Sequence, residues 1–185
     1  MINTSDRVCT LREAQYEDGE TATQLLRELG LNLPVGQDEM RYHWRRLWVD
    51  NPALNVDRPN LTKGWLLEDN GRMVGFFGNI PLLYDYCGRP IIIADASQWG
   101  VKKEYRDQTP RLAEAYFRQK NADLLLVTTG IKQTGRLFER YGGRPVPQPS
   151  YDQVLYWILN TREFLKAGLQ ELSISLILLS DILKI

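Results

Sequence analysis

The stretch IIIADASQWGVKKEYRDQTPRLAEAYF, residues 91–117, decides the predicted fold because it joins a buried strand to a helix. Three consecutive isoleucines predict a strand that is covered on both faces of its sheet. Gly100 follows, where the missing side chain permits a β-bulge or the close approach of a ligand. Thr109 and Pro110 then predict a helix start, with Thr109 as the N-cap. A helix N-terminus reached in this way commonly binds an anion, because its first amides have no partner within the helix.

The composition restricts the class of protein. A chain of 185 residues suits one domain with a substantial core. Lys plus Arg and Asp plus Glu each number 23, so no net charge favours nucleic acid or anionic lipid. Two cysteines and one histidine argue against a disulfide framework and a zinc site. The sequence shows neither a signal peptide nor a bilayer-spanning apolar run. We expect a soluble cytoplasmic protein that binds neither metal nor nucleic acid.

One strand and two helices are predicted before the hairpins. The strand covers residues 8–12, and the helices cover residues 20–29 and 38–49. The second helix carries a heavy load of aromatic side chains, which we expect to pack on the sheet. The alternative is that this helix and the long polar loop at residues 51–63 form the wall of a substrate pocket.

Two hairpins lead into the central strand. Asp69-Asn70-Gly71-Arg72 contains Asn-Gly, the strongest short hairpin signal in the chain. A second turn at Cys87-Gly88-Arg89 joins the next strand to the central one. Three consecutive antiparallel strands therefore precede the helix that starts at Pro110.

The remaining elements predict an α/β fold, a mixed sheet with helices on both faces. Residues 122–128 (ADLLLVT) predict a strand, residues 132–141 a helix, and residues 144–159 one or two closing strands. The strand at residues 122–128 returns through a crossover, so it should run parallel to the central strand. A V-shaped gap between these two parallel strands, near Gly100, is the expected ligand site.

Four segments of the chain together resemble the GNAT superfamily of acyl-CoA-dependent N-acyltransferases. They are WRRLWVDNP (44–52), GWLLEDNGRMVGFFGNIPLLY (64–84), DASQWGVKKEYRDQTPRLAEAYF (95–117) and TTGIKQTGRLFERYGGRPV (128–146). The Trp-rich helix and the Asn-Pro before the hairpin resemble a bacterial branch. The resemblance covers residues 8–159 and implies a GNAT-like acyltransferase domain over residues 1–160. It implies acetyl-CoA or another acyl-CoA as co-substrate, and a small-molecule amine or amino sugar, rather than a protein, as acceptor.

The resemblance also implies which residues bind the cofactor. In this family the central strand bulges and pairs with the pantetheine arm of acyl-CoA, and the following loop and helix hold its pyrophosphate. Thr109 and Arg111 stand where the family usually has small residues. Arg111 is expected to replace the lost backbone contacts as a fork of donors. The alternative is that Arg106 and Arg111 are solvated surface charges. The implied cofactor-binding residues are Trp99, Gly100, Val101, Arg106, Asp107, Gln108, Thr109, Pro110 and Arg111.

Acyl transfer to an amine requires a proton acceptor, a polarised carbonyl group and a stabilised thiolate. Side chains alternate along a strand, so Asp95 and Ser97 are expected to share a face with Trp99. Asp95 is the candidate base if burial raises its pKa. The alternative is a structural carboxylate bonded to a neighbouring hydroxyl or amide. His43 is either a packing residue or a second candidate base.

Two substitutions affect the predicted chemistry. Where many relatives carry a tyrosine acid this chain has Phe138, and where they often have Asn it has Ile131. Tyr141, about one helical turn after Phe138, is the candidate substitute acid, or it only packs. Two functions therefore stay open. The chain is an N-acyltransferase, or it is a catalytically degenerate member that acts as a CoA- or ligand-binding or interaction module.

Residues 161–185 are predicted to form an apolar helical tail, distinct from the preceding domain. A tail this apolar should not remain exposed. We expect it to cap the sheet. A homodimer contact, or the beginning of further chain, are the alternatives.

Overall fold

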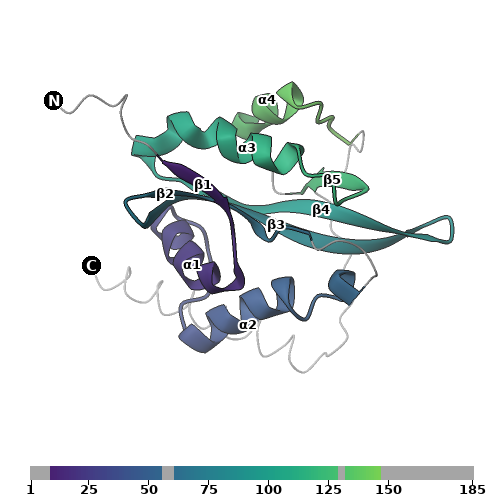
Figure 1. Ribbon diagram of the computed structural model, residues 1–185, viewed down its shortest axis with the longest axis horizontal. Helices are drawn as coiled ribbons and strands as arrows, with labels where there is room; N and C mark the ends of the chain where they lie inside the picture. Colours follow the sequence, from purple (N-terminus) through teal and green to yellow (C-terminus); the bar gives the residue numbers. More distant parts are fainter. Residues whose placement is uncertain (1–8, 56–60, 129–131, 147–185) are drawn as a thin grey trace, which may run out of the picture. The chain divides into compact units, whose positions relative to one another are not determined.

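The computed structural model describes residues 9–55, 61–128 and 132–146. Five strands form one sheet in the order β1-β2-β3-β4-β5, with only the β4–β5 pair parallel (Figure 1). This confirms the predicted mixed α/β sheet. The elements are β1 (Thr10–Glu13), η2 (Tyr16–Asp18), α1 (Gly19–Glu28), α2 (Gln37–Trp48), η3 (Pro52–Asn55), β2 (Gly64–Asp69), β3 (Arg72–Tyr86), β4 (Arg89–Val101), η4 (Lys103–Gln108), α3 (Thr109–Phe117), β5 (Leu124–Val127) and α4 (Lys132–Arg140), where η denotes a 3-10 helix.

Both hairpins form at the predicted residues because each turn contains two residues with a left-handed backbone. Asn70 and Gly71 have φ values of 50° and 73°, and Cys87 and Gly88 have values of 54° and 78°. Two consecutive positive φ angles match the twist of the flanking strands. The two turns therefore place β3 between β2 and β4, and leave the other edge of β4 for β5.

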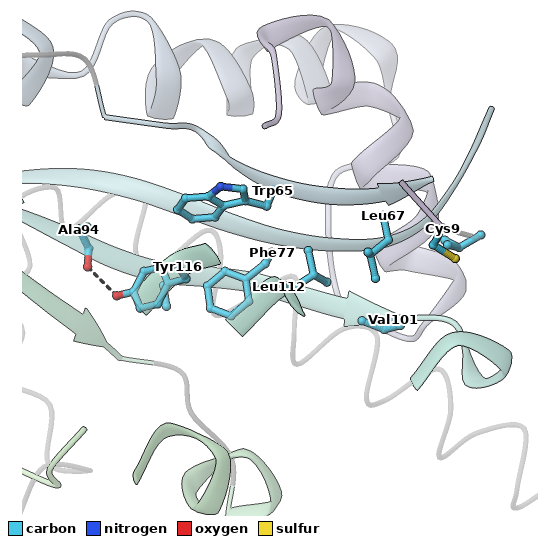
Figure 2. Close-up of a cluster of buried hydrophobic side chains, with 10 residues drawn as sticks. Cys9, Trp65, Leu67, Phe77, Ala94, Val101, Leu112 and Tyr116 are labelled. Carbon is cyan, nitrogen blue, oxygen red and sulfur yellow. Dashed lines mark hydrogen bonds between the residues drawn. The ribbon is translucent and has the colours of Figure 1, made fainter. Parts of the chain in front are cut away.

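Helices cover both faces of the sheet (Figure 1). On one face, α1 and α2 enclose a core in which Trp44 and Trp48 pack against Phe76. On the other, α3 packs Tyr116 against Phe77, as Figure 2 shows. Phe76 and Phe77 are consecutive in β3 and so point to opposite faces. The expected packing of the α2 rings on the sheet is confirmed for Trp44 and Trp48.

The contact between α1 and α2 depends on one buried hydroxyl. Thr23 Oγ1 accepts a hydrogen bond from Trp44 Nε1 at 2.8 Å and donates to the Gly19 carbonyl oxygen at 2.9 Å. Both Thr23 and Trp44 are buried. The hydroxyl therefore satisfies an indole N–H that would otherwise be buried without a partner.

We predict that Thr23→Val lowers the free energy of unfolding by about 1–3 kcal/mol, because it leaves the Trp44 N–H unpaired at almost unchanged volume. Urea unfolding measures this difference. Thr23→Ser, which keeps the hydroxyl, should lose less. Equal losses in the two variants would show that the methyl group, and not the hydrogen bond, is responsible.

A bulge interrupts β4 at Gln98, not at Gly100. Consecutive residues of β3 pair with Trp99 and with Ser97, so Gln98 has no opposite residue. Its φ angle is 57°, in the left-handed region that non-glycine residues rarely adopt. The extra residue reverses the alternation of side chains along the rest of β4.

Gly100 serves packing between α1 and the sheet. A Cβ atom at Gly100 would lie 2.6 Å from Leu29 Cδ1 and 2.9 Å from Leu26 Cδ2. A close approach to Gly100 therefore occurs as predicted. The groups that approach it are Leu26 and Leu29, on the side of α1, and not a ligand. The missing side chain at Gly100 lets α1 pack closely on β4.

The prediction that α3 begins with an open N-terminus is also wrong. The charged turn at residues 102–107 folds mostly as the 3-10 helix η4, which continues directly into α3. Gln108, not Thr109, is the N-cap, with helical backbone angles and no side-chain cap. The Thr109 amide donates to the Arg106 carbonyl oxygen. The 3-10 hydrogen bonds thus occupy amides that the sequence suggested were free.

The chain divides into a unit of residues 1–144 and a second unit of residues 145–185. All the elements above belong to the first unit. The predicted strand at residues 151–159 and the tail at residues 161–185 lie outside the described residues, so both stay predictions. Within the described ranges, no helix is both long and apolar enough to cross a membrane.

Candidate functional site

The parallel strands β4 and β5 part as predicted. They pair from Ile93 and Leu124 to Ala96 and Val127. β4 then continues to Val101, whereas β5 ends. Within the described residues, the backbone at 97–101 therefore has β3 on one side and no paired strand on the other. Backbone donors and acceptors on that side are suited to an extended ligand.

Tyr116 of α3 fixes the position where the strands part. Its hydroxyl oxygen lies 2.8 Å from the carbonyl oxygens of both Ala94 in β4 and Leu126 in β5. Figure 2 shows the first of these contacts. Burial raises the pKa of Tyr116, and the nearby Asp95 carboxylate raises it further. The phenol therefore stays protonated, and its one hydrogen is shared between the carbonyl oxygens of the two strands.

Asp95 is a buried carboxylate just before this position. Its neighbours Ala94 and Ala96 belong to the core under α3, so the Asp95 side chain projects to the opposite face. Thr128 Oγ1 donates to both carboxylate oxygens, at 3.1 and 3.2 Å. Burial raises the pKa of Asp95, although the hydroxyl and amide of Thr128 oppose the rise. Asp95 thus has features of both alternatives: its raised pKa suits a base, and its hydrogen bonds from the Thr128 hydroxyl suit a structural carboxylate.

Trp99 lies on the face opposite to Asp95, contrary to the expectation that the two share one. The bulge at Gln98 is the physical reason, because it shifts the alternation by one residue. The Trp99 ring centroid is 4.8 Å from that of Phe77 and 5.6 Å from that of Phe138. Trp99 therefore packs between the sheet and α4, on the side of α3.

The side chain of Gln98 connects the bulge to α2. Its Nε2 lies 2.8 Å from Nε2 of His43, which suits an amide donating to a neutral imidazole. Burial lowers the pKa of His43, and the positive charge of Arg46 lowers it further. The hydrogen bond to Gln98 raises the pKa and so opposes both effects. His43 is thus a half-buried neutral residue with one ring nitrogen engaged by the bulge.

A pocket of about 240 Å³ lies beside β3, next to the residues that immediately precede β2. Its position follows from three hydrogen bonds to the backbone of that strand. Trp48 Nε1 donates to the Asn79 carbonyl at 3.2 Å, Asn51 Nδ2 to the Pro81 carbonyl at 2.8 Å, and the Asn79 amide to the Lys63 carbonyl at 2.9 Å. The lining residues are Trp48, Val49, Leu54, Leu61, Lys63 and Pro81.

Comparison with known proteins identifies the fold. Neither a family model nor a curated protein matches the chain. Solved structures do match. Glucosamine-6-phosphate N-acetyltransferase from Arabidopsis thaliana is 11% identical with a TM-score of 0.56, over 82% of this chain and 99% of that one. A predicted acetyltransferase from Clostridium acetobutylicum, with acetyl-CoA, is 14% identical with a TM-score of 0.53, over 84% and 98%. Aminoglycoside N-acetyltransferase AAC(6')-Iy, with CoA, is 14% identical with a TM-score of 0.54, over 83% and 96%. The chain has the GNAT fold.

The residues predicted from the sequence to hold a pyrophosphate, 106–111, fall in η4 and the first turn of α3, and both elements are held by side-chain hydrogen bonds. Arg111 Nη1 donates to the Cys9 carbonyl oxygen at 2.9 Å and to Gln108 Oε1 at 3.0 Å. Tyr105 donates to an Asp69 carboxylate oxygen at 2.5 Å. Arg111 is therefore not a solvated surface charge, and at least one of its donors serves the fold.

The candidate GNAT acid, Tyr141, follows directly after α4 and packs on α3. Its hydroxyl donates to the Pro110 carbonyl oxygen at 3.3 Å, and its ring stacks on Phe117 with centroids 5.1 Å apart. Phe138, for which the sequence predicted the position of the family's tyrosine, contacts Trp99 of β4. The expected packing of Tyr141 is thus present, and its role as an acid stays a prediction.

Three residues of this site were not predicted from the sequence to belong to it: Thr128, Tyr116 and Gln98. Thr128 is the first polar residue after the apolar strand, which is a usable signal because parallel strands present their carboxyl ends together. Tyr116 reads only as part of an apolar helix face. Gln98 carries no local signal, since glutamine has no special preference for a left-handed backbone.

Proposed function

We propose that this protein is an acyl-CoA-dependent N-acyltransferase that uses acetyl-CoA. The observation that supports it best is the edge of β4 at residues 97–101, which no described strand pairs with where the strands part beside α3. The pantetheine arm of CoA contains amide groups and can add to such an edge as another strand would. Two of the matched structures with this fold contain CoA or acetyl-CoA.

The proposed cofactor contacts follow from this placement. The backbone of Trp99, Gly100 and Val101 pairs with pantetheine. Residues 106–111 hold the pyrophosphate near the positive end of the α3 dipole. The Thr109 amide already donates to the backbone carbonyl oxygen of Arg106. The guanidinium groups of Arg106 and Arg111 therefore supply much of the attraction to the pyrophosphate.

In the proposed reaction the amine nitrogen attacks the thioester carbonyl carbon, the carbon–sulfur bond breaks, and CoA leaves as a thiolate. A backbone amide near Gly100 or Val101 polarises the carbonyl oxygen. Asp95 accepts the proton that the amine loses, directly or through one water, and burial makes it a stronger base by raising its pKa. The thiolate takes a proton from solvent or Tyr141. Since thiols have a reference pKa of about 8.5, departure without an acid is feasible.

A small amine or amino sugar, in the cytoplasm, is the proposed acceptor. Two of the matched enzymes are named for glucosamine 6-phosphate and for aminoglycosides, both of which are amino sugars. The zero net charge of the chain provides no general attraction to nucleic acid. We further propose that the apolar tail at residues 161–185 covers the sheet or joins two copies of the chain.

Titration calorimetry with acetyl-CoA tests the proposal. The protein should bind acetyl-CoA saturably, and Arg111→Ala should weaken binding by about 1.5–3 kcal/mol, the range for a hydrogen bond to a charged group. Arg118→Ala removes the same charge at the other end of α3 and should change affinity little. No binding by the parent protein would refute the proposed function. Equal affinity of Arg111→Ala and the parent would confine Arg111 to its contacts with Cys9 and Gln108.

A second candidate function, CoA binding without catalysis, has support in the aromatic residues. Phe138 has no proton to donate, and Tyr141 is bonded to the Pro110 carbonyl. Thiol release with a panel of amines distinguishes the two functions. Release above background from any amine supports the transferase, whereas CoA binding without release supports the second candidate.

A further inference from the structure

The pocket beside β3 has the composition of a binding site for part of a small molecule. Trp48, Leu54, Leu61 and others contribute apolar side chains to it, and among the described residues that line the pocket Lys63 is the one that carries a charge. Leu61 and Trp48 are buried, while Lys63 is partly exposed. A lysine that lines a pocket can offer its ammonium group to an anion.

The pocket is also close to the candidate base. Pro81, one of its lining residues, pairs with Ala94 in β4, and the preceding residue of β3 pairs with Asp95. Neighbouring strands are separated by about 4.8 Å, so Pro81 lies about one strand away from the backbone next to Asp95. A molecule whose amine and anionic group sit on one sugar ring or one short chain can span that separation.

The walls are fixed by hydrogen bonds, not only by apolar packing. Trp48 and Asn51 both donate to backbone carbonyls of β3, and the Lys63 carbonyl accepts from the Asn79 amide. Asn51 Oδ1 also accepts from the Ala53 amide at 2.9 Å, which holds the start of η3. The backbone of Lys63 is thus held beside β3 by the fold.

We infer that this pocket receives an anionic substituent of the acceptor, and that Lys63 makes the protein select amines carrying a phosphate or carboxylate group. This inference rests on the proposed function and specifies its substrate class. The charge of Lys63 provides the attraction. The amine then lies toward Asp95.

Matched amines that differ in one anionic group test the inference. Glucosamine 6-phosphate is compared with glucosamine, and lysine with its decarboxylated counterpart cadaverine, in steady-state thiol release. The parent should favour the anionic member of at least one pair, and the pair that responds distinguishes phosphate from carboxylate. Lys63→Met should raise the KM of that anionic amine by about tenfold, the loss expected for one bond to a charged group. The KM values of the partner amine that lacks the anionic group and of acetyl-CoA should change less than the KM of the anionic amine.

Two variants complete the design. Lys63→Arg keeps the charge and should retain the preference, whereas Lys120→Met removes a lysine outside the pocket and should leave it unchanged. If Lys63→Met affects both members of a pair equally, the inference is wrong while the proposed function stands. If acetyl-CoA binds but neither anionic amine reacts with, or binds to, the CoA-loaded protein better than its partner, the inference is again overturned. Failure to bind acetyl-CoA at all would overturn the proposed function itself.

Discussion

Replacement of Gly78 by alanine should destabilise the sheet by about 1–3 kcal/mol or more, because the new methyl group overlaps with backbone. An ideal Cβ at Gly78 lies 2.5 Å from the Ser97 carbonyl oxygen and 3.1 Å from Phe76 Cε1. A backbone oxygen within a ladder cannot move aside as the end of a side chain can. Ser97 immediately precedes the bulge at Gln98, so the displaced strand should also bind acetyl-CoA more weakly.

Urea unfolding and calorimetry together measure this effect. Gly75→Ala is the matched control in the same strand, since its Cβ would meet only side-chain atoms, the nearest at 3.1 Å. It should therefore cost less stability and leave affinity for acetyl-CoA nearly unchanged. If Gly78→Ala matches Gly75→Ala in both measurements, the tight approach between β3 and the bulge does not determine the site.

Asp95→Asn should make the protein more stable at neutral pH and yet lower the rate of thiol release by about 10²–10⁴-fold, the range for loss of a general base. Burial raises the pKa of Asp95 above its ordinary value of 3.8. Between these two pKa values the folded protein binds more protons than the unfolded chain. Stability therefore falls as pH rises through that interval and stays lower above it. Asparagine carries no charge and avoids this loss.

The direction in which the stability gain changes with pH tests this explanation. The stability gained by Asp95→Asn should be full above the raised pKa and should shrink as pH falls toward 3.8. Asp38→Asn, on an exposed residue of α2, should show no such gain. Unchanged thiol release in Asp95→Asn would remove Asp95 from the mechanism. A variant that is less stable at neutral pH would show that the bond to Thr128 outweighs the cost of burial.

Much of the fold could be predicted because its signals are local. Asn70-Gly71 and Cys87-Gly88 have residue types that suit a left-handed turn, and these two turns set the order of three strands. The apolar run before Thr128 predicted β5, and the crossover required it to be parallel to β4. The parting of β4 from β5 followed from those two inferences.

The details of the site depend on contacts across the sheet, which the sequence does not display. The bulge at Gln98 forms opposite Gly78, and a prediction from β4 alone placed it at Gly100. That shift of two residues moved Trp99 to the other face and separated it from Asp95. Similarly, threonine is a residue type that favours the N-cap position, which led to the prediction for Thr109. The preceding residues form a 3-10 helix that leads directly into α3, so no side-chain cap is needed there.

The hydroxyl of Tyr116, bonded to carbonyl oxygens of both β4 and β5, has a consequence for the thermodynamics of ligand binding. The gap between the strands is held in shape by a buried side chain of the protein, before any ligand arrives. The conformational entropy lost in ordering that gap thus belongs to folding and not to association. A preorganised edge of this kind can recruit an extended, flexible ligand arm whose own entropy is then the principal ordering cost.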